Sequence, residues 1–215
     1  MTAAVVFDLD GVIVDSEQVW DDVREQYVRE AGGSYSERAT RDMMGMSSLE
    51  WSRYMAEALG VPGTPDEINA AIVERMLARY GEAPPLISGA VEAVRRVAER
   101  WPLAVASSSN PELIEVVLRA SGLASLFPVA VSSQEVPRGK PSPDVYLEAA
   151  RRLRVDAERC GAVEDSHNGI RSAKAAGMLV VAVPNPHYPP DDEAVELADV
   201  VVASIGELQV EHFAV

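Results

Sequence analysis

The sequence predicts an α/β protein whose core is a doubly wound parallel sheet, interrupted near its start by a helical insertion. From residue 86 onward, short and fully apolar runs alternate with longer stretches of helical periodicity. Strands that helices cover on both faces have this unbroken apolar character, which is typical of a parallel sheet. A chain of 215 residues suffices for such a core, because it buries roughly 70% of the surface that unfolding exposes.

The apolar runs and the helical stretches give the expected order of elements. Strands are expected at residues 3–7, 103–106, 129–131, 161–163, 179–183 and 200–203. Helices are expected between them at residues 89–100, 111–121, 143–153 and 168–176, and Gly177 ends the last of these. This alternation is that of a Rossmann-like core.

The insertion occupies residues 16–85, where helical periodicity is found and no strand-like run. Apolar residues recur at helical spacing around Val23, Trp51 and Ile72, and glycine- and proline-containing segments separate these stretches. We therefore expect an α/β core formed by residues 1–15 and 86–215 and a helical cap formed by residues 16–85.

Charge and composition narrow the class of partner. The chain has 19 lysines and arginines against 34 aspartates and glutamates, a net charge of −15. Such a surface repels nucleic acid and anionic membranes, so neither is an expected partner. The single cysteine, Cys160, cannot form an internal disulfide and is expected to be buried. With no basic apolar leader at its start, the chain is expected to be cytoplasmic.

Polar residues follow the ends of several expected strands. Asp8 and Asp10 follow the first, Ser107 the second, and Glu164 and Asp165 a later one. Ligands of open α/β sheets bind beyond the carboxyl ends of the strands, where these side chains would meet. Lys140, in the loop of residues 139–144, would join them. Unpaired carboxylates so close together would repel one another, and an all-oxygen ligand set favours Mg²⁺.

Each of these residues also has a simpler interpretation. Aspartates after strands commonly form turns or helix caps, and a lone lysine is usually solvated. Residues 107–110 precede Pro111, as a helix N-cap does, which is compatible with phosphate binding by Ser107, Ser108 and Asn110. The combination, rather than any member, favours a catalytic site. Outside it, His167 is expected at a helix start on the surface, and Trp20, Trp51 and Trp101 are expected at helical core positions.

Four motifs, in order, carry a resemblance to a known family. Phe7-Asp8-Leu9-Asp10-Gly11-Val12-Ile13-Val14-Asp15-Ser16 resembles the first signature of the haloacid dehalogenase superfamily. Ser107, Gly139-Lys140-Pro141-Ser142-Pro143-Asp144 and Val163-Glu164-Asp165-Ser166 resemble its second, third and fourth signatures. The resemblance covers essentially the whole chain, cap included, and is strongest to the β-phosphoglucomutase-like phosphatases.

The resemblance implies a role for each matching residue. Asp8 would be the nucleophile that becomes an aspartyl-phosphate, and Asp10 the general acid and base. Ser107 and Lys140 would hold the phosphoryl group. Asp165, with Glu164, would bind Mg²⁺ together with the Asp8 carboxylate and the Asp10 backbone carbonyl.

Two related activities differ from this pattern. The dehalogenases lack the second aspartate, which is present here as Asp10. β-Phosphoglucomutases carry a histidine at the position of Trp20 and a lysine near the position of Ile72. They also carry an arginine after the cap-loop motif that is Gly45-Met46-Ser47 here, and this chain has Ser48 at that position. None of these three positions is cationic here, which favours hydrolysis and a small or weakly charged leaving group. For a mutase, Arg41 or Arg75 would have to supply the missing charge.

We therefore expect a Mg²⁺-dependent phosphomonoesterase that acts on a small phosphorylated metabolite. A sugar phosphate is the first expectation, followed by phosphoglycolate or a polyol phosphate. The cap residues expected to face the substrate are residues 45–48 and those around Trp20. A non-catalytic binding module is disfavoured, because binding alone needs neither a nucleophile nor a proton donor.

Overall fold

A parallel sheet runs through the computed structural model, which describes residues 1–43, 46–186 and 189–214. Its six strands have the order β3-β2-β1-β4-β5-β6. The strands are β1 (Ala4–Phe7), β2 (Leu103–Ser107), β3 (Val129–Ser132), β4 (Cys160–Glu164), β5 (Leu179–Ala182) and β6 (Val200–Val201). All six pair in parallel, which confirms the predicted fold class.

The strand order reverses at β1, and this reversal positions the site. The chain passes from β1 to β2 and β3 on one side, then crosses to β4, β5 and β6 on the other. Phe7 of β1 lies opposite Val163 of β4, so the residues that follow them emerge side by side. Such a switch point is where ligands bind in open α/β sheets.

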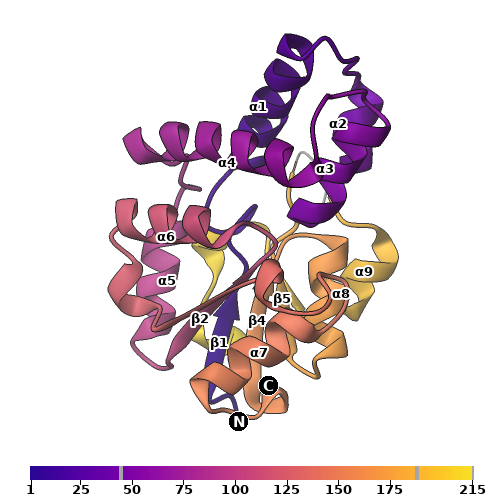
Figure 1. Ribbon diagram of the computed structural model, residues 1–215. Helices are drawn as coiled ribbons and strands as arrows, with labels where there is room; N and C mark the ends of the chain where they lie inside the picture. The colour runs from indigo at the N-terminus through magenta and orange to yellow at the C-terminus, as the bar shows by residue number, and fades with distance from the viewer. Residues whose placement is uncertain (44–45, 187–188, 215) are drawn as a thin grey trace.

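Two apolar layers cover the sheet because side chains alternate along each buried strand. Val5 and Phe7 belong to the cluster that includes Val94 and Leu113, whereas Ala4 and Val6 belong to the cluster that includes Tyr146. Helices α5 (Ala90–Ala98) and α6 (Pro111–Ala120) therefore cover one face, and α7 (Asp144–Leu153) and α8 (His167–Ala175) the other (Figure 1). Helix α9 (Asp192–Leu197) packs against α8.

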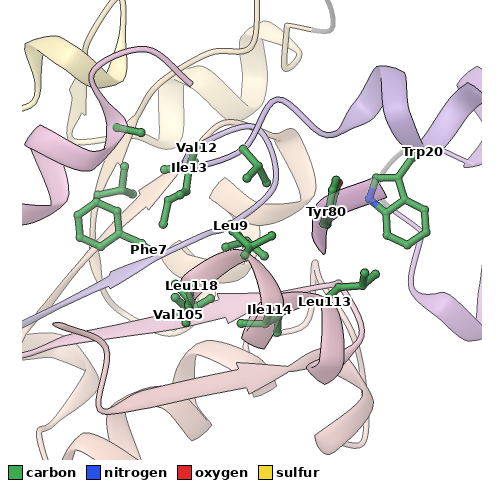
Figure 2. Close-up of a cluster of buried hydrophobic side chains, with 14 of the residues drawn as sticks. Phe7, Leu9, Val12, Ile13, Trp20, Tyr80, Val105, Leu113, Ile114 and Leu118 are labelled. Atoms are coloured by element: carbon green, nitrogen blue, oxygen red, sulfur yellow. The ribbon is translucent and has the colours of Figure 1, made fainter. Parts of the chain in front are cut away.

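Four helices stand beyond the carboxyl ends of the strands (Figure 1). They are α1 (Glu17–Glu30), α2 (Glu37–Met43), α3 (Ser48–Glu57) and α4 (Pro65–Glu82). Helix α4 packs against α1, α3 and α6. Figure 2 shows that one apolar cluster runs from Phe7 and Leu9 through Leu113 to Tyr80 and Trp20 of these helices. Burial of this shared surface holds the four helices over the sheet.

Helices α2 and α9 were not predicted from the sequence. Both are short, with only Ala39 and Met43 of α2 and Ala194 of α9 buried, so neither shows a clear apolar period.

The expected helical position of Trp101 is wrong. Helix α5 ends at Ala98, and Trp101 lies beyond it with its indole N–H donating to the Thr2 carbonyl at 3.0 Å. Cys160 is buried, as expected. Within the described residues, no helix is both long and apolar enough to span a bilayer.

Candidate active site

The polar residues predicted from the strand ends lie together at the switch point. Asp8 directly follows β1, Glu164 is the last residue of β4, and Asp165 follows it. Lys140 reaches the same place from the loop that precedes α7. All four are buried, with 9% or less of each residue exposed.

Lys140 joins two of these carboxylates. Its Nζ donates to Asp8 Oδ1 at 2.7 Å and to Glu164 Oε1 at 2.6 Å. The Tyr146 hydroxyl also donates to Glu164 Oε1, at 2.6 Å. Burial favours the neutral amine, but Asp8 and Glu164 outweigh it and raise the pKa of Lys140 above its ordinary value. The lysine is therefore a fixed positive charge beside Asp8.

Three carboxylates form a cluster suited to a cation. Asp8, Glu164 and Asp165 each offer an oxygen, and these oxygens lie within 4.8 Å of one another. Burial raises the pKa of Asp8 to about 8; Lys140 opposes this rise, and Glu164 and Asp10 add to it. Burial, followed by Glu164 and Asp8, raises the pKa of Asp165 well above its ordinary value. A divalent cation would relieve this repulsion, so the donor set fits the predicted metal site.

Hydrogen bonds occupy both oxygens of Glu164. Besides Lys140 and Tyr146 on Oε1, its Oε2 accepts from the Asp165 N–H at 3.1 Å and from the Ser166 N–H and hydroxyl at 3.4 and 3.2 Å. This side chain is fully buried. Glu164 therefore orients Lys140 and the chain that leads into α8.

Asp10 accepts hydrogen bonds from three serines. Ser16 Oγ donates to its Oδ1 at 2.5 Å, and Ser109 and Ser107 donate to its Oδ2 at 2.7 and 3.3 Å. The next residue, Gly11, has a φ of +79°, and a Cβ there would lie 1.8 Å from Asp165 Oδ2. The absence of a side chain at Gly11 thus lets the Asp10 loop approach Asp165.

A cavity of about 140 Å³ opens between this cluster and helices α1, α2 and α3. Ser108, Ser109 and Lys140 line it, but Ser107 and Asn110 do not lie in its described wall. Ser107 Oγ instead accepts from the Ser109 N–H at 2.9 Å, and the Asn110 side chain accepts from Ser48 Oγ at 2.7 Å. Of the predicted phosphate-binding residues, Ser108 and Lys140 therefore face the cavity, while Ser107 and Asn110 lie behind it.

The cap side of the cavity corresponds in part to the sequence expectation. Trp20, Met46 and Ser48 line it, whereas Ile72 is buried inside α4, and Gly45 lies outside the described residues. His167, the first residue of α8, also lines it and is only half-buried. The expectation named no other individual residue of this side. The remaining described residues of 16–85 in the wall are Ser16, Glu17, Asp21, Arg24, Thr40, Met43 and Trp51.

Although Trp20, Ser48 and Ile72 are uncharged, the wall contains a cation that was not predicted. Arg24 of α1 lines the cavity. Arg41 is exposed, and Arg75 pairs with Glu30 at 2.7 Å away from the cavity wall. The signal for Arg24 is its spacing: together with Glu17, Trp20 and Asp21 it occupies one face of a helix, at positions i, i+3, i+4 and i+7.

Comparison with known sequences identifies the family of this chain. The family model for haloacid dehalogenase-like hydrolases matches residues 2–177. Hexitol phosphatase B of Escherichia coli K12 is 33% identical over 208 residues, which cover 95% of this chain and 93% of that protein. The bifunctional riboflavin kinase/FMN phosphatase of Arabidopsis thaliana is 32% identical over 215 residues, which are 99% of this chain but 56% of that longer protein.

Solved structures show the same fold. CbbY of Rhodobacter sphaeroides, in complex with phosphate, matches with a TM-score of 0.88 and 28% identity over the whole of both chains. β-Phosphoglucomutase of Clostridium difficile matches with a TM-score of 0.84 and 21% identity, over 100% of this chain and 96% of that one. The chain belongs to the haloacid dehalogenase-like hydrolases and is a phosphatase of that family.

Proposed function

We propose that this protein is a Mg²⁺-dependent phosphomonoester hydrolase that works through an aspartyl-phosphate on Asp8. The observation that carries the proposal is the Lys140–Asp8 contact of 2.7 Å, set in an acidic cluster at the sheet switch point. Phosphoryl transfer mainly needs positioning and neutralisation of charge. The lysine supplies one positive charge, and the cluster fits a cation that supplies the other.

The reaction requires two displacements at phosphorus. In the first, an Asp8 carboxylate oxygen bonds to phosphorus, the ester oxygen leaves, and Asp10 donates a proton to it. In the second, Asp10 takes a proton from a water that attacks the aspartyl-phosphate, which frees phosphate and restores Asp8. The three serines on Asp10 hold its carboxyl group beside the cavity. The positive charge of Lys140 stabilises the transferring group in both steps.

Asp8, Asp165 and the Asp10 backbone carbonyl are the proposed metal ligands. A bound Mg²⁺ would offset the charge of the phosphoryl oxygens. Glu164 could join them only by giving up a hydrogen-bond donor, because five donors already occupy its two oxygens. Its proposed main role is to position Lys140.

Residues 16–85 form the proposed cap, and residues 1–15 and 86–215 the proposed core. Ser48 of α3 donates to Asn110 at the start of α6, which links the two parts beside the cavity. Closure of the cap would exclude water and select the leaving group. A phosphorylated sugar or polyol is the proposed substrate, a choice supported by the similarity to a hexitol phosphatase.

Phosphate release from a panel of phosphorylated metabolites tests the proposal. The panel contains sugar, polyol and glycolate phosphates, each assayed with Mg²⁺ and with EDTA. We expect release with Mg²⁺, loss with EDTA, and loss in an Asp8→Asn variant that keeps its circular dichroism spectrum. Undiminished release by purified, folded Asp8→Asn would disprove the mechanism.

A further inference from the structure

Arg24 extends from α1 into the cavity wall and is held by two tryptophans. Its guanidinium carbon lies 4.7 Å from the ring centroid of Trp20 and 4.9 Å from that of Trp51. The two ring centroids are 5.9 Å apart. Both tryptophans also line the cavity. Contact with two aromatic faces restricts the rotamers of the arginine and leaves its planar donor edge available.

This arginine lacks an ionic partner. Among residues 1–43, 46–186 and 189–214, no carboxylate oxygen lies within 4.0 Å of its nitrogens, and its buried Nε makes no hydrogen bond. The neighbouring carboxylate of Asp21 accepts hydrogen bonds from Tyr35 and, at 2.7 Å, from Thr40. Burial lowers the pKa of Arg24 to about 10, so the guanidinium is still charged at neutral pH. The residue as a whole is half-buried, and a charge whose donor nitrogen is buried is normally paired.

Along α1 the charge of the cavity wall changes sign. Glu17 lies at the start of this helix, and its Oε2 is buried without a hydrogen-bond partner. Arg24 follows seven residues later, which corresponds to about 10 Å of helix rise. Since Asp8, Asp10 and Asp165 also line the cavity, its core side is acidic. An anionic group of a substrate would be repelled there unless a cation or Lys140 met it, but attracted at Arg24.

We propose that Arg24 is a specificity-determining residue that binds a second oxyanion on the leaving group. The substrate class is a phosphomonoester whose alcohol part carries another phosphate or a carboxylate, and this inference rests on the proposed phosphatase function. The transferring phosphoryl group would lie at Asp8, and the second oxyanion would pair with the guanidinium between Trp20 and Trp51. This pairing would supply the partner that the guanidinium lacks.

Two matched pairs of compounds test the proposal. Ribulose 1,5-bisphosphate is compared with ribulose 5-phosphate, and 3-phosphoglycerate with glycerol 3-phosphate. Within each pair, kcat/KM is measured for wild type, Arg24→Met, Arg24→Lys and Arg75→Met. Arg75 is the matched control, because its guanidinium lies 4.9 Å from the Tyr27 ring on the same cap but pairs with Glu30 outside the cavity wall.

The expected result is a change in the ratio within a pair. Wild type should prefer the doubly anionic member of at least one pair, and the pair that shows it identifies the second group as phosphate or carboxylate. Arg24→Met should lower that ratio about 10- to 100-fold, mainly through KM, as expected for loss of a charge-assisted contact. Arg24→Lys should restore part of it, and Arg75→Met should leave it unchanged.

Several results would overturn the inference. They are a wild type without preference in either pair, equal losses on both members in Arg24→Met, and an equal change in Arg75→Met. Binding of the same four compounds, measured by calorimetry, gives the same comparison without turnover. If none of the substrates releases phosphate, the proposed function is contradicted instead. The binding preference measured by calorimetry would then still test the role of Arg24. If Arg24→Met fails to fold, the wild-type preference and Arg24→Lys decide.

Discussion

At the scale of single residues, Lys140 contacts two buried carboxylates and so lets them lie close together. It donates to Asp8 and Glu164, and the Tyr146 hydroxyl shares the second acceptor. Removal of one partner of such a network leaves a buried charge uncompensated, which costs more than the net gain of the intact pair. Lys140 therefore supports the fold of the site as well as the proposed chemistry.

The effect of replacing Asp10 should depend on the leaving group of the substrate. Asp10→Asn removes proton transfer but keeps the backbone carbonyl, so Mg²⁺ affinity should change little. Turnover of alkyl phosphates should fall by about 10²–10⁴-fold, the usual contribution of general acid–base catalysis. An aryl phosphate, whose leaving group needs little protonation, should lose less. Steady-state kinetics on both substrates measure this, and equal losses would show that Asp10 only supports the loop.

Alanine substitutions at Gly11 and Gly32 test whether the Asp10 loop must lie close to Asp165. Both have a φ of +79°. A Cβ at Gly11 would lie 1.8 Å from Asp165 Oδ2, whereas a Cβ at Gly32 would have no heavy atom of the described residues within 4 Å, apart from its neighbours along the chain. Each alanine substitution should cost about 1–3 kcal/mol through the backbone. Only Gly11→Ala should also lose Mg²⁺-dependent activity, because Asp165 must move. Thermal melts and phosphate release separate the two effects, and an active Gly11→Ala enzyme would contradict the proposed role of Asp165.

The sequence allowed the residues at strand ends to be predicted, and the structure brings Asp8, Lys140 and Asp165 together as expected. The contribution of Tyr146 could not be predicted. Tyr146 lies on the buried face of α7, where the sequence alone does not distinguish it from an ordinary core residue. Its role depends on the hydrogen bond from its hydroxyl to Glu164, which only the folded structure shows.

At the scale of elements, α1 shows why the cap side of the site was harder to predict. Its apolar positions, such as Val23 and Val28, identify the helix and its buried face. Glu17, Asp21 and Arg24 form a second, polar face that lines the cavity. A polar helix face ordinarily lies in solvent, so sequence periodicity cannot distinguish it from the wall of a site that another part of the chain covers.

Ion pairs along α7 should make a pH-dependent contribution to stability. Glu148 accepts hydrogen bonds from Arg151 at 2.6 and 2.7 Å and from Arg152 at 2.7 Å. These bonds lower its pKa from 4.5 to about 2. Because the folded state lowers this pKa, the stabilisation is complete above pH 4.5 and is lost as the pH falls toward 2.

Glu148→Gln should therefore lower the free energy of unfolding by about 0.5–1 kcal/mol at pH 7, a value typical of exposed pairs. The difference from wild type should shrink below about pH 4.5. Urea denaturation across this range measures it. Glu115→Gln is the control, because its pair with Arg119 is about 70% exposed at both side chains and should contribute less. A difference that grows on acidification would contradict the assignment.

At the scale of the whole molecule, the four cap helices and the sheet share one apolar cluster. This explains why the fold could be predicted so fully: fully buried strands and amphipathic helices each carry a local pattern. The cavity wall, by contrast, is assembled from α1, α2, α3 and four segments of the core, and no local pattern encodes the part that the helices contribute. The cytoplasmic location stays a prediction, as does the lack of nucleic-acid and membrane partners that was inferred from the net charge.

The residues at three cap positions predict hydrolysis rather than mutase chemistry. A mutase must hold either end of a bisphosphate while it keeps water from the aspartyl-phosphate. Trp20, Ser48 and Ile72 are uncharged, where the resemblance to β-phosphoglucomutases implies cations. An oxyanion site at Arg24 would hold the far end of a substrate but would not by itself keep water out. We expect β-glucose 1-phosphate, if accepted, to yield glucose and free phosphate. Product analysis with catalytic bisphosphate present checks this, and rapid formation of glucose 6-phosphate with little phosphate release would reverse the assignment.

The central claim is that phosphate passes through Asp8, and trapping that intermediate tests it most directly. Enzyme that is turning over substrate with Mg²⁺ is quenched and reduced with borohydride, which converts an acyl phosphate to an alcohol, and its peptides are analysed by mass spectrometry. The account predicts reduction at Asp8, dependent on substrate and absent without it. Reduction at another carboxylate, or none during rapid turnover, would contradict it.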